Sequence, residues 1–170
     1  MSYDLHMYRR RPGKGFEESM DLLEQIEIGE KVPDEVLSAM RLDKGRLANE
    51  MLASALPLEK FGDSDSGGDI ELNNREGSLP DIQFLFSDYS IGVSIPYWEQ
   101  DAAQKQALEG AWRIMADFAS RNGLVLYDSQ IDAEASAESF AESGPSFEFA
   151  EKALREFSNQ QQKRPWWKFW

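Results

Sequence analysis

The sequence predicts an α+β fold in which helices pack on one face of a mostly antiparallel sheet of about four to five strands. Apolar residues alternate with other residues in 82–87 and again in 91–97, which is the period of a half-buried strand. Asp88, Tyr89 and Ser90 connect the two segments over a hairpin length, so the strands should pair antiparallel. Segment 101–122 carries a wide apolar stripe at helical spacing and ends at Asn122-Gly123, which predicts a long amphipathic helix.

The remaining elements follow from the same two periods and from helix and strand breakers. Tyr3, Leu5 and Met7 share one face of a first strand, and His6 lies on the opposite face. We expect three helices after this strand. The first runs from Phe16 to about Ile28, the second opens at 32–34, and the third is N-capped by Asp43 and stopped by Pro57. Short strands are expected at 70–72, before the hairpin, and at 124–127, after the long helix.

The composition divides the chain into four parts. Residues 1–130 should form a single α+β domain, because they contain all the regular periodic segments up to the last strand. Small and acidic residues dominate 131–146, which predicts a flexible acidic connector. A C-terminal helix is expected over 147–162, and a basic Trp-rich tail follows over 163–170.

Charge and composition exclude several classes of function. The 170 residues have a formal net charge of -13, no Cys and one His. Residues 1–60, 61–162 and 163–170 contribute -3, -13 and +3, so the negative charge belongs to the second part of the chain. This acidic balance argues against direct nucleic-acid binding, because neutralising phosphates needs clustered Lys and Arg, and the chain has no thiol for catalysis or metal binding. The sign of the charge instead favours a basic protein partner.

Local motifs do not predict catalysis or a cofactor. His6 has no nucleophile elbow to activate, and no phosphate-binding or dinucleotide fingerprint occurs. Segment 63–71 resembles part of a calcium loop, with Asp63, Asp65, Asp69 and Glu71 as candidate ligands. Asn74 stands where that loop needs a bidentate Glu, so a solvated acidic loop is the competing interpretation. We therefore expect a protein that is not an enzyme and binds no cofactor or metal.

The last eight residues combine three cations with four aromatic side chains: Lys163, Arg164, Lys168, Trp166, Trp167, Phe169 and Trp170. So much apolar surface requires a partner. Three interpretations remain open: the tail docks on the body of the protein, lies at a membrane interface, or anchors a protein partner. The start of the chain shows no basic region followed by an apolar one, which predicts a cytoplasmic protein.

Three segments and the tail carry a resemblance. Residues 2–8, 92–98 and 123–130, together with the terminal Trp-Trp-Lys-Phe-Trp, resemble small uncharacterised bacterial proteins. Some of that group resemble immunity proteins of polymorphic or contact-dependent toxin systems. The resemblance covers about residues 1–130 and implies a bacterial origin, a small α+β fold and, as one option, an immunity function.

The expected function is a non-enzymatic acidic binding protein, most concretely an immunity-type inhibitor that caps a basic toxin or enzyme. Hairpin tips and strand ends present side chains at a rim. The expected partner-binding residues are therefore Asp88, Tyr89, Trp98, Glu99 and Asp101. The alternative is a membrane-peripheral or scaffold protein anchored by its tail.

Overall fold

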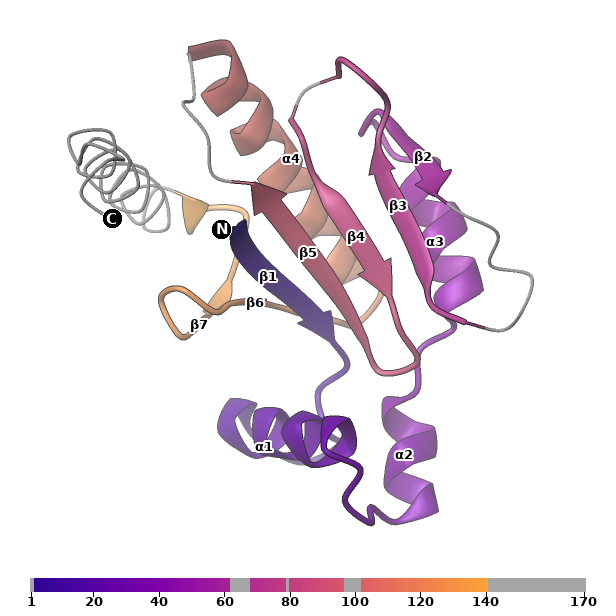
Figure 1. Ribbon diagram of the computed structural model, residues 1–170. Coiled ribbons are helices and arrows are strands. Elements are labelled where there is room, and N and C mark those ends of the chain that lie inside the picture. The colour runs from indigo at the N-terminus through magenta and orange to yellow at the C-terminus, as the bar shows by residue number, and fades with distance from the viewer. Residues whose placement is uncertain (1, 62–67, 79, 97–101, 141–170) are drawn as a thin grey trace, which may run out of the picture.

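In the described part of the chain, seven antiparallel strands form one open sheet in the order β2-β3-β4-β5-β1-β6-β7. The computed structural model describes residues 2–61, 68–78, 80–96 and 102–140 (Figure 1). The strands are β1 (Ser2–Tyr8), β2 (Leu58–Phe61), β3 (Ile70–Asn74), β4 (Gln83–Phe86), β5 (Ser90–Pro96), β6 (Val125–Asp128) and β7 (Ala133–Ala135). The helices in these ranges are α1 (Phe16–Glu27), α2 (Asp34–Met40), α3 (Lys44–Leu52) and α4 (Ala102–Arg121).

The first strand of the chain lies inside the sheet, between β5 and β6. His6 is opposite Gly92 of β5 on one side and opposite Tyr127 of β6 on the other. The hairpin predicted from the alternation is confirmed, because β4 and β5 pair with Phe84 opposite Val93. The sheet therefore joins segments from both ends of the described chain around β1.

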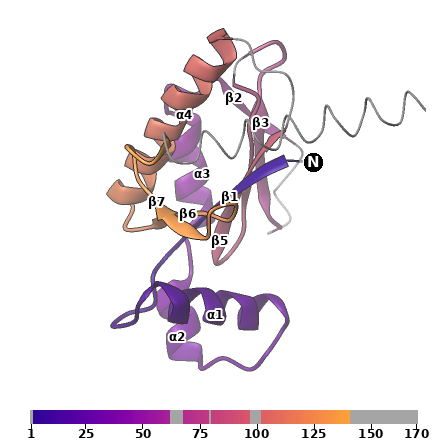
Figure 2. The ribbon, with the colours of Figure 1, turned by 90° about the vertical axis from the view of Figure 1, so that its left-hand side faces the viewer.

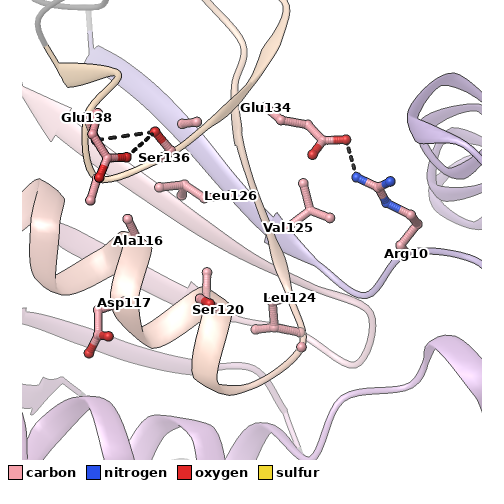
Figure 3. Close-up of a pocket in the computed structure, with 14 residues that line it drawn as sticks. Arg10, Ala116, Asp117, Ser120, Leu124, Val125, Leu126, Glu134, Ser136 and Glu138 are labelled. Carbon is pink, nitrogen blue, oxygen red and sulfur yellow. Dashed lines mark hydrogen bonds and ion pairs between the residues drawn. The ribbon is translucent and has the colours of Figure 1, made fainter.

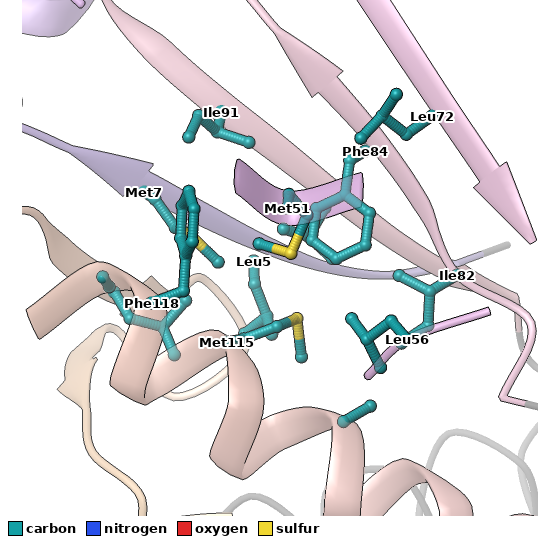
Figure 4. Packing of buried hydrophobic residues seen from close by; sticks show 14 of the residues in the cluster. Leu5, Met7, Met51, Leu56, Leu72, Ile82, Phe84, Ile91, Met115 and Phe118 are labelled. Carbon is teal, nitrogen blue, oxygen red and sulfur yellow. The ribbon is translucent and has the colours of Figure 1, made fainter. Parts of the chain in front are cut away.

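Helices α3 and α4 cover one face of the sheet (Figure 2). Leu5 and Met7 of β1 meet Met51 of α3 and Met115 and Phe118 of α4 in the main core (Figure 4). Each fully buried large apolar side chain contributes about 1.5–3 kcal/mol through removal from water. The predicted cap of α3 is confirmed, since the Asp43 side chain accepts a hydrogen bond from the Arg46 amide at 3.1 Å.

A second, smaller core lies on the opposite face, at one end of the sheet. There α1 and α2 enclose Tyr8 of β1 together with Leu22, Leu23, Val32 and Met40. Phe16 packs against Tyr127, with ring centroids 5.3 Å apart. The expectation that helices pack on one face therefore describes α3 and α4, whereas α1 covers only the end of the other face.

The α+β class is confirmed, and the prediction of four to five strands is wrong because the sheet has seven. The two additional strands lie at its edges, where alternation is weak: three of the four residues of β2 are exposed, and β7 is only Ala-Glu-Ala. β7 lies inside the segment predicted to be a connector. The predicted C-terminal helix and tail fall outside the described residues. No described helix has the length and apolarity needed to cross a membrane.

Two tyrosines of β1 are completely buried, but their hydroxyl groups have different surroundings. The Tyr3 hydroxyl donates a hydrogen bond of 2.5 Å to Oδ2 of Asp128, which is also fully buried. The Tyr8 hydroxyl has no hydrogen-bond partner among the described residues. Burial is the main reason that the pKa of Tyr8 rises to about 12, and the nearby Glu134 carboxylate raises it further.

We predict opposite effects for the same substitution at these two positions. Tyr3→Phe removes a donor to a buried carboxylate and should lower the free energy of unfolding by about 1–3 kcal/mol. Tyr8→Phe removes an unpartnered hydroxyl and should leave the free energy of unfolding unchanged or raised. Urea denaturation of both variants measures the difference. Equal losses of stability would contradict these assignments.

A second prediction concerns alkaline pH. An unfolded tyrosine ionises near pH 10, whereas folded Tyr8 keeps its proton until about pH 12. The stabilisation that this proton provides is complete below pH 10 and is lost as the pH rises through 12. Urea denaturation between pH 9 and 12 should show a shallower decline for Tyr8→Phe than for the unsubstituted protein, by at most about 1.4 kcal/mol per pH unit. Parallel declines would contradict the raised pKa.

Candidate functional site: the uncovered face of the sheet

The face of the sheet that points away from α3 and α4 is called the open face. It faces the viewer in Figure 1, where the strands lie in front of α4. The strand registers place its side chains in two rows that cross the sheet. One row contains Glu59, Asn73, Gln83, Ser94 and Asp4. The other contains Phe61, Glu71, Leu85, Gly92, His6, Tyr127 and Glu134.

The centre of the open face is hollow and partly apolar. Gly92 contributes no side chain between Leu85 and His6, and a hollow of about 340 Å³ lies over it. Leu85 is 43% exposed and Phe61 is 62% exposed, although both are strand residues. A glycine inside a strand often marks a position where another group approaches the backbone closely. The hollow is therefore a candidate binding position.

Three carboxylates of the open face form no ion pair with another described residue, and two of them line this hollow. Asp4 accepts hydrogen bonds from the hydroxyls of Ser2 and Ser94 at 2.8 and 2.9 Å, both on Oδ1. Glu71 accepts from Gln83 at 2.6 Å and from Asn73 at 3.1 Å. The third carboxylate is the exposed Glu59. The rows contain no Lys or Arg, so the open face has uncompensated negative charge.

Asp4, His6 and Ser94 share this face but do not have the geometry of a nucleophile activated by histidine. Such activation requires the hydroxyl to donate to the imidazole. Here the Ser94 hydroxyl donates to Asp4 instead. His6 instead lies near Tyr127, with ring centroids 6.3 Å apart.

Two of the predicted partner-binding residues have contacts within the protein itself. Asp88 forms ion pairs with Lys44 at 2.8 Å and with Arg41 at 3.0 Å. The hydrogen bond to Lys44 is the main cause that lowers the pKa of Asp88 below its usual value. Tyr89 is half-buried against the second core. The other three predicted residues, Trp98, Glu99 and Asp101, lie outside the described residues, as do Trp166, Trp167, Phe169 and Trp170.

The calcium candidates are divided between surfaces as far as the structure describes them. Asp69 lies 3.8 Å from Lys44, whereas Glu71 belongs to the open face. Asp63 and Asp65 fall outside the described residues. Within the described ranges, no group of three or more His, Asp or Glu side chains is placed to hold a metal ion.

A second hollow, the α4–β7 groove, has about 640 Å³ and lies between α4 and the edge of the sheet (Figure 3). Its charged groups have partners: Arg10 pairs with Glu134, Asp117 pairs with Arg121, and Glu138 accepts from the Ser136 hydroxyl. Two of its three carboxylates are therefore compensated by arginines of the same chain, whereas Glu138, like Asp4 of the open face, accepts from a hydroxyl group.

Several residues of the open face were not predicted as a site. Alternation in β1 and β4 places Asp4 and Gln83 opposite the core, so the signal for their direction was present in the sequence. That signal does not show which face stays uncovered, nor that Gly92 lies between Leu85 and His6. The chain matches no protein-family model, and neither a curated protein nor a solved structure was found to be similar to it.

We predict that the hollow can be filled without loss of stability. A Cβ added at Gly92 would meet Leu85 Cβ at 4.0 Å, which is ordinary van der Waals contact. Gly92→Val should keep or raise the free energy of unfolding, by up to about 1 kcal/mol, because valine favours strands and glycine does not. Chemical denaturation measures this change. A loss above about 1 kcal/mol would show that a valine side chain collides with Leu85 or displaces another segment of the chain from the hollow.

Proposed function

We propose that the protein is a non-enzymatic binding protein whose open face caps a basic surface of another protein, in the manner of an immunity-type inhibitor. The observation that carries the proposal is that Asp4 and Glu71 line the hollow together with exposed Leu85, while Glu59 lies farther along the same face on β2. No described cation compensates these three carboxylates, whereas Asp88 and Glu134 have partners in their own chain.

The charges would guide association. A cationic surface on a partner is attracted to the face that has unpaired carboxylates, and the net charge of -13 adds to that attraction at longer range. Each exposed ion pair contributes only about 0.2–1 kcal/mol to affinity. Their main effects are therefore a faster association and selection of a basic partner.

The apolar centre would supply the stable contact. Leu85 is an exposed side chain beside the hollow over Gly92, so a partner's aliphatic or aromatic side chain could be buried there, and exposed Phe61 on the edge strand β2 extends the apolar surface of the same face. Burial of such anchors at the centre of an interface usually dominates its binding energy. The surrounding polar groups, Gln83 and Ser94 among them, would form the rim.

An immunity-type inhibitor fits this arrangement for a chemical reason. A toxin that acts on nucleic acid holds substrate phosphates with basic side chains. Carboxylates at fixed positions on a rigid sheet can occupy the same basic side chains and exclude the substrate. This function requires no catalytic group on the inhibitor.

The test uses three full-length proteins as baits in an extract of the native host. The first is unsubstituted, the second carries Asp4→Asn, Glu59→Gln and Glu71→Gln, and the control carries Glu24→Gln, Glu35→Gln and Asp117→Asn. The control removes the same charge from the exposed surfaces of α1, α2 and α4. A specific partner should bind the first and third baits and should be a basic protein whose toxicity the unsubstituted protein neutralises.

Calorimetry with the purified partner then measures how much each set of substitutions changes the binding affinity. Loss of three pairs at about 0.5 kcal/mol each should weaken binding about tenfold for the second protein. Raised salt should weaken binding to the unsubstituted protein and reduce the difference between the variants. The proposal fails if the open-face variant and the control bind the partner equally well, or if binding does not depend on salt.

A further inference from the structure

We propose that residues 163–170 of the chain bind its own open face, with an aromatic side chain over Gly92 and the basic residues beside the uncompensated carboxylates. The proposal goes beyond the proposed function, because it requires no second protein. It assigns an occupant to a surface that the described helices leave uncovered.

Charge complementarity is the first argument. Lys163, Arg164 and Lys168 are the only charged residues in the segment, and all three are cations. The open face offers three carboxylates without ion pairs among the described residues, namely Asp4, Glu59 and Glu71. The segment thus carries the charge that this surface lacks, in the same number.

The apolar groups are complementary as well. Four of the eight residues in the segment are aromatic, and aromatic side chains bury about 150–250 Å² each. The open face has exposed Leu85 beside the hollow over Gly92, and exposed Phe61 on the edge strand β2. An aromatic ring laid across a strand glycine would cover exposed backbone and contact the neighbouring side chains, as aromatic residues do when they compensate for glycine in sheets.

The connecting chain is long enough. Residues 141–162 separate the segment from Phe140, whose ring lies 5.6 Å from that of Trp112. As a flexible chain these residues would span about 25 Å on average, and the helix expected over 147–162 would by itself span about 24 Å. Three strand spacings, from β7 to β5, amount to only about 14 Å. The segment can therefore reach the centre of the open face from the edge of the sheet.

The α4–β7 groove is larger and nearer to Phe140, but its charges favour the segment less. Two of its three acidic residues, Glu134 and Asp117, already pair with arginines of the same chain. Binding of the segment there would replace existing ion pairs, whereas binding at the open face would form new ones. The charges therefore favour binding of residues 163–170 to the open face over binding to the α4–β7 groove.

The consequence is competition for one surface. A basic partner that uses the open face must displace residues 163–170, so the segment would select partners whose affinity exceeds its own. Because the segment is tethered, it is present at a high effective concentration, which makes this selection effective even for weak contacts.

The absence of cysteine in the chain makes a direct test possible. Gln83→Cys in the full-length protein places the only thiol on the exposed open face, and Asp117→Cys places it on α4 as a control. The rate of reaction with a thiol reagent is measured for each, with the natural segment and with Trp166→Ser, Trp167→Ser, Phe169→Ser and Trp170→Ser. No partner is present, so failure of this test is distinct from failure of the proposed function.

We expect the thiol at position 83 to react about tenfold faster when the aromatic residues are replaced, which corresponds to a bound fraction near 90% with the natural segment. The thiol at position 117 should react at the same rate with the natural segment and with the aromatic residues replaced. Gly92→Val with the natural segment should also make the thiol at position 83 react faster, because the valine side chain fills the hollow that the aromatic ring would occupy. Replacement of Lys163, Arg164 and Lys168 by Ser should accelerate the reaction as well.

Three results would overturn the proposal. Equal rates at position 83 with and without the aromatic residues would show that the segment does not cover the open face. Protection that increases with protein concentration would show that the segment binds a second copy instead of its own chain. Slower reaction at position 117 with the natural segment would place the segment on the side of α4.

Discussion

Antiparallel pairing of β1 with both β5 and β6 is the constraint on which the rest of the structure depends. It sets His6 opposite Gly92 and Tyr127, and the two-residue period then directs Leu5 and Met7 to the helices and Asp4 to the other face. A shift of one residue would exchange these faces and bury the carboxylate of Asp4. The cost of burying an unpaired charge makes such a register unfavourable, so core and open face are specified together.

The helices cover the two faces of the sheet unequally, which leaves the open face as a candidate site. α3 and α4 extend over the main core, whereas α1 covers only the end of the opposite face (Figure 2). Tyr8 is completely buried beneath α1, and Asp4, four residues earlier on the same face, is only partly buried. The boundary between them marks where helices stop shielding the sheet. Beyond it, polar and apolar side chains are both available to a ligand.

Local patterns predicted the parts of the fold that depend on neighbours in sequence. The alternation in 82–87 and 91–97 gave the central hairpin, and Asp43 was recognised as a helix cap. The edge strands were missed because β7 has three small or acidic residues and pairs only on one side. Asp88 was assigned to a partner, since the sequence does not show that Lys44 approaches it across the fold. Its spacing from other acids makes Glu71 a candidate ligand of a calcium loop or part of a solvated acidic loop, whereas sheet register places it on the open face.

The account predicts that the carboxylates of the open face are the groups a basic partner covers. Carbodiimide footprinting with mass spectrometry measures the modification of each carboxylate in a protein with Trp166, Trp167, Phe169 and Trp170 replaced by Ser, so that the segment 163–170 does not cover the open face, alone and with the purified partner. Asp4, Glu59 and Glu71 should become less reactive in the complex, while Glu24, Glu35 and Asp117 should keep their reactivity. Protection confined to the second set, with the open face unchanged, would contradict the central claim.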